Sequence, residues 1–542
     1  MADQNSSFHR RAGGRKRRCW GAYFCDSRFD RYVSCRSRWV YGYRADATPN
    51  VVAFADQGTI FVHADSQIPL TLPSHDALFT STYPFQNRIE ENAERVGPGA
   101  VTLAAVLRSH GYKTAAFVSS VFLEREMGLD QGFDFYDSPF QFEAFSPLSG
   151  SMFFSGATRF GARDRRDGAL AVHAALEWLS QNRGQPVFCF VHLYDLHKPY
   201  KRGSYDAELR YTDEVLGGLR KGLEAAGWWD RALVVLLADH GESLGEHGEA
   251  SHGYFIYEST LAVPLIFHWP EGARPLGSRV EQAAGLVDVA PTILDFLHLT
   301  APESFEGASL LRGVEHPIYA ESVHAHDSFG WAPLRSLRVG DLKYIEAPKA
   351  ELYNLREDPA EKVNLAAKNP DEARRLRGEL GKMLARYAAR PAANGNVSPE
   401  TRALLGSLGY LAPGPGVKVA GTGADPKDRL AEFQLYERAM VLLYERHVSA
   451  AIAVLRRILV GDPKNTLARR DLGDCYLEER EYRAARAQLA RVAAVVPDDY
   501  VSQYELGIAD ERLRLWKEAR AHLEIACKLA PEAGSAGRSW SR

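Results

Sequence analysis

Residues 233–253 read LVVLLADHGESLGEHGEASHG, and this stretch decides the fold class. It opens with the apolar run 233–237, which is typical of a short strand covered on both faces, as in an α/β protein. Three histidines and four acids follow within fourteen residues. Open α/β sheets bind ligands beyond the carboxyl ends of their strands. The stretch therefore predicts a metal or anion site at a strand end, with a polar surface loop as the alternative.

Asp239 and His240 are the first polar residues after this predicted strand. Together they offer a divalent metal one carboxylate oxygen and one imidazole nitrogen. The glycines that follow let the backbone bend closely around such a site. An isolated Asp-His-Gly carries little weight, so the prediction depends on the density of acids and histidines around it.

The same alternation of patterns continues on both sides of this stretch. From Tyr41 onward, helical segments alternate with short apolar runs that are bounded by turn residues, which predicts an α/β domain. The predicted helices cover 99–110, 170–179 and 288–297, and the predicted strands cover 114–118, 187–194, 233–237 and 264–267.

The C-terminal part contains an internal repeat. Pro463, Pro497 and Pro531 lie 34 residues apart, and an alanine series and a leucine series run in phase with them. A 34-residue period with small residues where two helices touch is the tetratricopeptide pattern. It predicts an all-α module over 428–535. A Gly/Pro/Ala-rich linker over 412–427 precedes the module, so we expect it to be separable from the first domain.

The bulk composition narrows the protein class. A chain of 542 residues predicts two or three domains, and a net charge of −3 gives no reason to expect nucleic acid. Six cysteines do not make a disulfide framework, and no run of about 18 apolar residues predicts a membrane span. The basic N-terminus lacks the apolar region of a signal peptide; taken literally, it predicts a cytoplasmic protein.

Two further segments carry polar groups at predicted element ends. Thr71 stands where a helix N-cap belongs, and the positive end of the helix dipole would favour its alkoxide and hold an anion. A purely capping Thr is the alternative. His197 and Lys198 follow the predicted strand 187–194 and could bind an anionic oxygen or protonate a leaving group. A structural His is the alternative there.

Together the three segments resemble the sulfatase family of the alkaline-phosphatase superfamily. Residues 71–84, TLPSHDALFTSTYP, resemble the signature in which a Cys or Ser opens C-x-P-S-R and L-T-G-x-Y-P follows. Residues 238–242, ADHGE, resemble the metal motif, and residues 195–200, DLHKPY, resemble D-P-H-x-P-Y. The resemblance covers roughly 41–411, with a small subdomain over about 315–411, and the fusion to repeats resembles a bacterial subgroup.

The resemblance implies a mixed sheet sandwiched by helices and a metal-dependent reaction at an anionic sulfate or phosphate ester. It implies one divalent ion (Ca, Mn, Zn or Mg), a covalent intermediate and a protein partner for the repeats. The implied site consists of Thr71 as nucleophile and metal ligand, Asp239 and His240 as further ligands, and His75, His197 and His252 around the transferred group.

Two departures from the family pattern alter these expectations. Thr71 cannot form the formylglycine that true sulfatases make from Cys or Ser, and His75 replaces an Arg. A Thr here looks more like the phosphodiesterase and phosphoethanolamine or phosphoglycerol transferase branches, so a phosphodiester is at least as good a candidate as a sulfate. The two acids that end the family's first strand fall at about Arg31 and Arg36, and cations oppose metal binding. The alternative function is a catalytically impaired scaffold that binds a protein through its repeats.

Residues 1–40 differ from the rest of the chain. The first 44 residues hold eleven Arg or Lys, three Asp or Glu and three cysteines, where the family has an apolar strand. We expect this segment to be disordered or aberrant, and a frame-shifted replacement of the metal-binding first strand explains it. The alternative is a lineage-specific N-terminus on a non-catalytic member.

Overall fold

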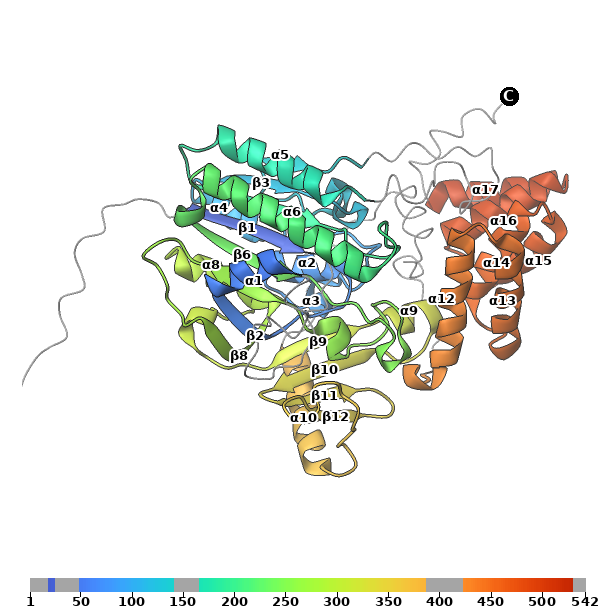
Figure 1. Cartoon of the computed structure of the whole chain (residues 1–542). Helices are drawn as coiled ribbons and strands as arrows, with labels where there is room; N and C mark the ends of the chain where they lie inside the picture. The colour runs from blue at the N-terminus through green and yellow to red at the C-terminus, as the bar shows by residue number, and fades with distance from the viewer. Residues whose placement is uncertain (1–17, 25–47, 141–164, 387–422, 530–542) are drawn as a thin grey trace, which may run out of the picture.

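The structure is a computed structural model that describes residues 18–24, 48–140, 165–386 and 423–529. Figure 1 shows a large domain built on a sheet and a helical module beside it. The sheet has the strand order β4-β3-β5-β1-β6-β7-β2-β8, and it is mixed because β7 runs antiparallel to β6 and β2. Its strands are β1 (Arg18–Phe24), β2 (Thr59–Asp65), β3 (Lys113–Phe117), β4 (Phe135–Asp137), β5 (Val187–Leu193), β6 (Ala232–Ala238), β7 (Leu265–His268) and β8 (Arg279–Gly285). This is the mixed α/β sheet that the sequence predicted.

Two groups of helices pack on the large sheet. The helices of this domain are α1 (Pro49–Asp56), α2 (Thr71–Thr80), α3 (Pro84–Asn87), α4 (Leu103–Ser109), α5 (Gly168–Gln181), α6 (Tyr205–Ala225), α7 (Glu258–Leu261) and α8 (Val289–Phe296). α6 contacts α1 and α5, whereas α2 contacts α4 and α8. The helix predicted over 99–110 begins later, because Thr102 Oγ1 accepts a hydrogen bond from Ala105 N at 3.1 Å and caps α4.

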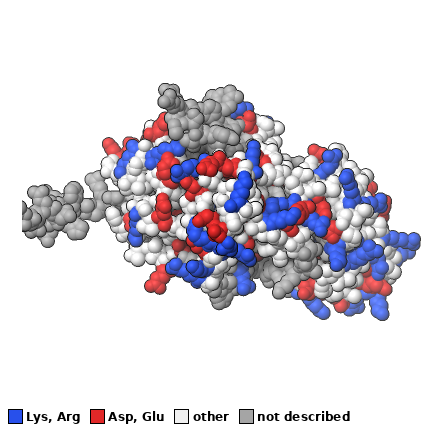
Figure 2. All heavy atoms as spheres, turned by 90° about the horizontal axis from the view of Figure 1, so that it is seen from below, with Lys and Arg blue, Asp and Glu red and all other residues white. Residues whose placement is uncertain are grey.

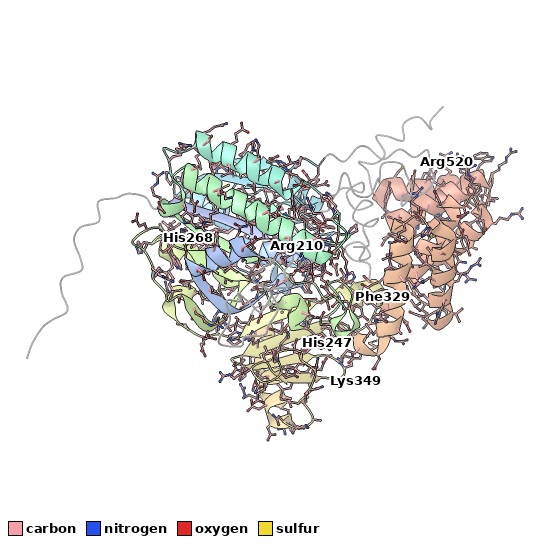
Figure 3. The ribbon with its side chains drawn as sticks, viewed as in Figure 1. Arg210, His247, His268, Phe329, Lys349 and Arg520 are labelled. Atoms are coloured by element: carbon pink, nitrogen blue, oxygen red, sulfur yellow. The ribbon has the colours of Figure 1, made fainter. Side chains whose placement is uncertain are left out.

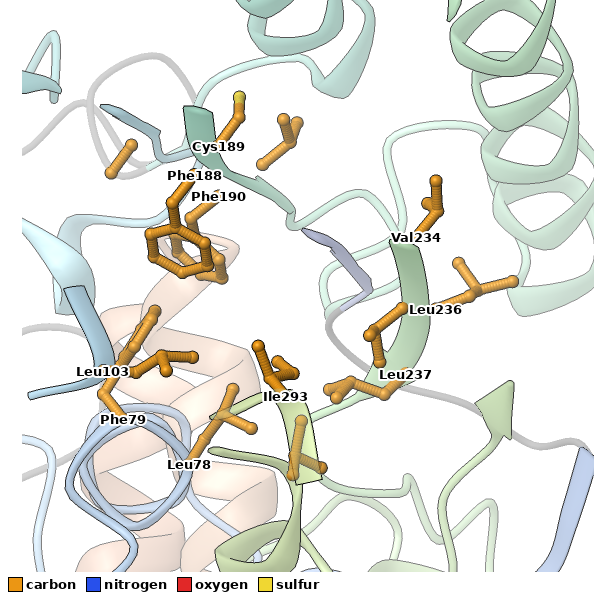
Figure 4. Packing of buried hydrophobic residues seen from close by; sticks show 14 of the residues in the cluster. Leu78, Phe79, Leu103, Phe188, Cys189, Phe190, Val234, Leu236, Leu237 and Ile293 are labelled. Atoms are coloured by element: carbon orange, nitrogen blue, oxygen red, sulfur yellow. The ribbon is translucent and has the colours of Figure 1, made fainter. Parts of the chain in front are cut away.

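Strands β5 and β6 form the centre of the core, since every residue in both is buried. Figure 4 shows Phe188 and Phe190 directed toward Phe79 and Leu103, whereas Cys189 points to the opposite face. Phe79 and Phe190 meet edge to face with their ring centroids 5.0 Å apart, a geometry that aromatic pairs favour. The apolar runs that were predicted to be strands buried on both faces are therefore confirmed as such strands.

The N-terminal segment supplies the strand between β5 and β6. β1 pairs in parallel with both, and Phe24 at its end is level with Leu193 and Ala238. Residues 18–24 are the described part of the segment 1–40, which was expected to be disordered or aberrant, and they form a strand. Its sequence, RCWGAYF, is apolar after Arg18 and rich in aromatic residues, which favour strands. The two acids expected at about Arg31 and Arg36 lie outside the described residues.

A small antiparallel sheet follows the large one, in the order β12-β11-β10-β9. Its strands are β9 (Ile318–Ser322), β10 (Leu334–Val339), β11 (Leu342–Glu346) and β12 (Glu351–Asn354), and α10 (Pro370–Arg386) packs on it through buried Leu376 and Leu380. Lys343 ties this sheet to the large domain, because its Nζ lies 3.0 Å from Glu258 Oε1 of α7. This corresponds to the predicted subdomain, of which residues 387–411 lie outside the described part.

The C-terminal module consists of paired helices that repeat every 34 residues. They are α12 (Leu430–Tyr444), α13 (Val448–Gly461), α14 (Thr466–Glu478), α15 (Tyr482–Val495), α16 (Tyr500–Arg512) and α17 (Trp516–Leu529). A Cβ on Gly473 would lie 2.6 Å from Leu489, and one on Gly507 would lie 2.7 Å from Leu523. The helices of a pair therefore touch where the sequence repeats Gly and Leu, as the period predicted.

The repeat module is docked onto the large domain. A single apolar cluster contains Tyr254 and Trp331 of the large domain together with Phe433 and Tyr436 of α12. The C-terminal end of the predicted linker over 412–427 is attached to the large domain. Ala332 N donates a hydrogen bond to Ala424 O at 2.9 Å, and a 3-10 helix covers Pro426–Arg429. The expectation of a separable module therefore conflicts with the structure. A period in the sequence reveals a repeat, but it does not reveal which surface the first helix covers.

The surface carries charges of both signs. On the face drawn in Figure 2, acidic and basic side chains are interspersed over the large domain and the repeat module. Within the described residues, no helix is long and apolar enough to cross a membrane.

Candidate active site

Thr71 is the first helical residue of α2. The sequence predicted it as the N-cap, but the structure gives that position to Leu70, whose φ and ψ of −143° and 142° are extended. Thr71 is fully buried. The first N–H groups of a helix lack partners within it, and here Leu72 N donates to Asn92 Oδ1 at 2.9 Å. Asn92, which the sequence analysis did not single out, thus holds the turn that carries the Thr71 hydroxyl.

β6 delivers His240 from its carboxyl end to this hydroxyl. His240 Nε2 lies 3.4 Å from Thr71 Oγ1. Nδ1 carries the ring proton in the neutral form, because it lies 2.9 Å from the Gly241 carbonyl oxygen, which can only accept. Burial lowers the pKa of His240 to about 4, although Asp239 opposes this effect. The ring is therefore neutral near pH 7, with a lone pair at Nε2 for a proton or a metal.

Asp239 connects the end of β6 to α2. Its Oδ2 lies 3.6 Å from His240 Nε2 and 3.6 Å from His75 Nδ1. His75 lies one turn after Thr71, and its Nδ1 donates to the Thr71 carbonyl oxygen at 2.7 Å. Burial lowers the pKa of His75, against the opposing effect of Asp239. Its buried Nε2 has no hydrogen-bond partner among the described residues, so it is available to a ligand.

His192 of β5 belongs to the same cluster, although the sequence analysis missed it. It points to the same face as Phe190, and its ring lies edge-on to that of His75 with centroids 5.1 Å apart. Ser119 N donates to its Nδ1 at 3.4 Å. Burial, reinforced by His75, lowers the pKa of His192 well below its ordinary value. The sequence feature that could have revealed His192 is that it is the one polar residue in the apolar run 187–194.

The segment after β5 supplies His197. Its ring stacks on Tyr194 with centroids 4.4 Å apart, and the guanidinium of Arg165 donates to the three carbonyl oxygens of residues 197–199 at 2.9 to 3.0 Å. Burial, then His252 and Arg165, lower the pKa of His197 well below its ordinary value. His197 is therefore a rigidly held, neutral imidazole at pH 7.

His252 closes the cluster. Its ring centroid lies 4.3 Å from that of His240 and 5.0 Å from that of His197. Nδ1 lies 3.2 Å from Glu242 Oε2, and both side chains are buried. This carboxylate orients the ring through Nδ1. The structure thus brings all six predicted site residues together, and it adds Glu242, His192 and Asn92 as their supports.

A divalent cation fits part of this cluster. Asp239 offers a carboxylate, His240 an Nε2 lone pair and Thr71 a hydroxyl oxygen, which are ligand types found around such ions. Within the described residues, no group of three His, Cys, Asp or Glu side chains is arranged to hold a metal. These three residues would therefore need further ligands, and residues 25–47, which follow β1, lie outside the described part.

Solved structures identify the fold of the large domain. The phosphonate monoester hydrolase of Agrobacterium radiobacter matches with a TM-score of 0.55 and 20% sequence identity, covering 69% of this chain and 96% of that one. At this identity the likeness establishes the fold alone. The large domain has the alkaline-phosphatase-like fold that these hydrolases share.

Sequence comparisons give the family. Residues 34–299 match Sulfatase, residues 245–389 match N-sulphoglucosamine sulphohydrolase, C-terminal, and residues 442–507 match Tetratricopeptide repeat. The Delta 4,5-hexuronate-2-O-sulfatase of Bacteroides thetaiotaomicron is 23% identical over 427 residues, which cover 63% of this chain and 83% of that protein. The arylsulfatase of Clostridium perfringens is 26% identical over 196 residues, or 34% of this chain and 40% of that protein. The chain belongs to the sulfatase family and carries tetratricopeptide repeats after the sulfatase domain.

Proposed function

We propose that the chain is a metal-dependent hydrolase or transferase of sulfate or phosphate esters with Thr71 as nucleophile. A phosphodiester is at least as good a candidate substrate as a sulfate. The proposal is carried by the 3.4 Å approach of Thr71 Oγ1 to His240 Nε2 beside Asp239, at the edge where open sheets bind ligands. Relatives named as sulfatases, and a phosphonate monoester hydrolase of the same fold, support an anionic ester as substrate.

The Thr71 hydroxyl loses its proton to solvent and attacks sulfur or phosphorus through Oγ1, and as this bond forms, the bond to the leaving alcohol oxygen breaks. That oxygen takes a proton, and water or an acceptor alcohol then displaces Thr71. The start of α2 stabilises the negative charge that develops. Asp239, His240 and Thr71 would hold the divalent ion, which neutralises charge and lowers the pKa of the hydroxyl when bound.

The three remaining histidines have separate roles in this scheme. Glu242 orients the His252 ring through Nδ1, and this ring is the one we assign to give the proton to the leaving oxygen. His197 is neutral and held through its own backbone by Arg165, so it offers a fixed nitrogen to the transferred group. His75 offers its buried Nε2 from α2.

A substrate screen tests the proposal. The full chain is assayed with an aryl sulfate, an aryl phosphate monoester and an aryl phosphodiester, each with Ca²⁺, Mn²⁺, Zn²⁺ or Mg²⁺. We expect metal-stimulated turnover of at least one ester, and its loss in His252→Gln but not in a matched change of the exposed His447. The absence of turnover together with the absence of a copurifying metal would favour the second candidate, a scaffold that binds a protein through its repeats. The incomplete ligand set among the described residues is the observation behind that candidate.

A further inference from the structure

The carboxyl end of β9 touches both halves of the candidate active site. One half is the start of α2, which carries Thr71, and the other is the segment after β6, which carries His252. Strand β9 belongs to the small sheet and not to the sheet that holds β6. Its last residue, Ser322, and the first residue of α9 (His324–Phe329) make the contacts. The small subdomain is therefore in a position to align the two halves.

Ser322 holds the half that carries His252. It is buried, and its hydroxyl donates to the Gly253 carbonyl oxygen at 2.6 Å, one residue after His252. On the other side of this peptide group, Tyr254 N donates to Glu249 Oε1 at 2.8 Å. The peptide group that follows His252 is thus fixed both at its carbonyl oxygen and at its N–H.

His324 holds the half that carries Thr71. Its Nδ1 lies 3.2 Å from Glu91 Oε1 and 3.4 Å from Oε2. The ring nitrogen donates, because an ionised carboxylate can only accept. Glu91 is buried and directly precedes Asn92, whose Oδ1 accepts from Leu72 N at 2.9 Å. A contact from the small subdomain therefore fixes the loop that in turn fixes the first turn of α2.

The two contacts are linked through one turn of the chain. His324 N donates to Ser322 Oγ at 3.3 Å, which leaves the hydroxyl proton for Gly253. At the other end of α9, Phe329 lies edge-on to Tyr436 of α12 with ring centroids 5.4 Å apart. Figure 3 labels Phe329 where α9 meets the repeat module. Packing on both sides leaves this turn little freedom to move.

We propose that Ser322 and His324 are positioning residues of the active site. Through one turn of the small subdomain they hold His252, the proton donor of the proposed function, at a fixed place relative to the nucleophile Thr71. In-line transfer needs the nucleophile and the leaving oxygen on opposite sides of the transferred group, so a small displacement of either half slows it. The catalytic consequence rests on the proposed function; the ordering of the two peptides does not.

Amide hydrogen exchange on the full chain tests the ordering. Ser322→Ala should speed the exchange of Tyr254 N–H about tenfold, and His324→Ala should speed that of Leu72 N–H about tenfold, as expected when one hydrogen bond is lost. His324→Asn places an amide N–H near the position of Nδ1 and should bring the exchange of Leu72 back to the parent rate. His326→Ala is the matched control and should behave as the parent, because the His326 side chain lies on the same helix, is 43% exposed and pairs with a different acid.

Turnover separates the two halves. Ser322→Ala displaces the proton donor, so kcat should fall about tenfold for an ester of a poorly leaving alkyl alcohol and less than about twofold for an activated aryl ester, which needs no proton. His324→Ala displaces the nucleophile and should lower kcat about tenfold for both esters. The KM should stay within about twofold in each variant, and His324→Asn should recover the parent kcat.

Each outcome decides the matter. Exchange at the parent rate in Ser322→Ala or in His324→Ala overturns the role of that residue, whether or not any ester is turned over. A uniform rise in exchange along the chain overturns the proposal as well, because it reports a global loss of stability.

The kinetic outcomes are equally decisive. Faster local exchange with an unchanged kcat in an active parent overturns the catalytic consequence. Equal losses of kcat for both esters in Ser322→Ala overturn the assignment of Ser322 to the proton donor. A parent that turns over no ester in any metal contradicts the proposed function instead, and the exchange measurement then decides the positioning role alone.

Discussion

Replacing Phe433 by Ala tests whether the repeat module shares a core with the sulfatase domain. The Phe433 side chain is 6% exposed, stacks on Tyr254 at 3.9 Å and lies edge-on to Phe329 at 6.4 Å. Truncating a core Phe to Ala costs about 3–5 kcal/mol, of which an aromatic pair itself accounts for about 0.5–1.5 kcal/mol. We expect the free energy of unfolding to fall by about 3–5 kcal/mol, because neither domain can close the space alone.

Urea unfolding of the full chain, followed by fluorescence and circular dichroism, measures this loss. Val441→Ala is the matched control, because Val441 lies on the same helix with 54% exposure and should change stability by less than about 0.5 kcal/mol. The shared core would be refuted if Phe433→Ala lowered the free energy of unfolding by less than about 1 kcal/mol. It would also be refuted if the unfolding transition of the large domain were unchanged by the substitution. By the same reasoning, a chain that ends at Asp425 should aggregate, since it exposes Tyr254 and Trp331.

Three further predictions concern the metal, a buried acid and the N-terminus. Asp239→Asn should lower metal content and activity together, measured by metal analysis and turnover; unchanged stoichiometry contradicts its role as a ligand. Burial raises the pKa of Asp76 to about 7, so the folded chain holds a proton there that the unfolded chain loses near pH 3.8. The parent should therefore lose about 4 kcal/mol relative to Asp76→Asn as the pH rises from about 4 to about 8, and urea unfolding with no such trend refutes this. Residues 18–24 already supply the strand between β5 and β6, so the frame-shift explanation now concerns the acids that follow it. Another reading frame of the gene should encode an Asp about ten residues before Tyr41 and a second about five before it, as a strand that delivers metal acids requires; if no frame does, the frame-shift explanation is wrong.

The fold could be predicted where a local pattern mirrors the packing. β5 and β6 are recognisable in the sequence as apolar runs because both of their faces are buried. The repeat helices are recognisable because each repeat unit needs the same small and apolar residues at the same positions to pack. β1 was missed although residues 19–24 are apolar or aromatic, because this short run stands in an Arg-rich segment with no clear period. Docking of the repeats was invisible for a related reason. Nothing in the sequence around Tyr254 or Phe433 indicates that these two aromatic rings stack on each other in the folded chain.

The candidate site divides along the same line. Thr71, Asp239 and His240 stand in short motifs next to element ends, so their proximity followed from the fold class. Their supports are distant in sequence: Asn92 reaches Leu72 from a loop after α3. Gln434 of the repeat module reaches the Gly248 carbonyl oxygen of the other domain. Such pairs depend on tertiary geometry, which no local spacing encodes.

The most direct test of the account is the identity of the nucleophile. The parent is mixed with an ester that it turns over, quenched in acid and digested, and the peptide that contains Thr71 is examined by mass spectrometry. The account predicts a sulfuryl or phosphoryl group on Thr71, and it predicts a folded Thr71→Ala variant with neither the adduct nor turnover. Turnover by that variant within about tenfold of the parent would contradict the account, because such a loss is too small for a missing nucleophile. An adduct on another residue would contradict it as well.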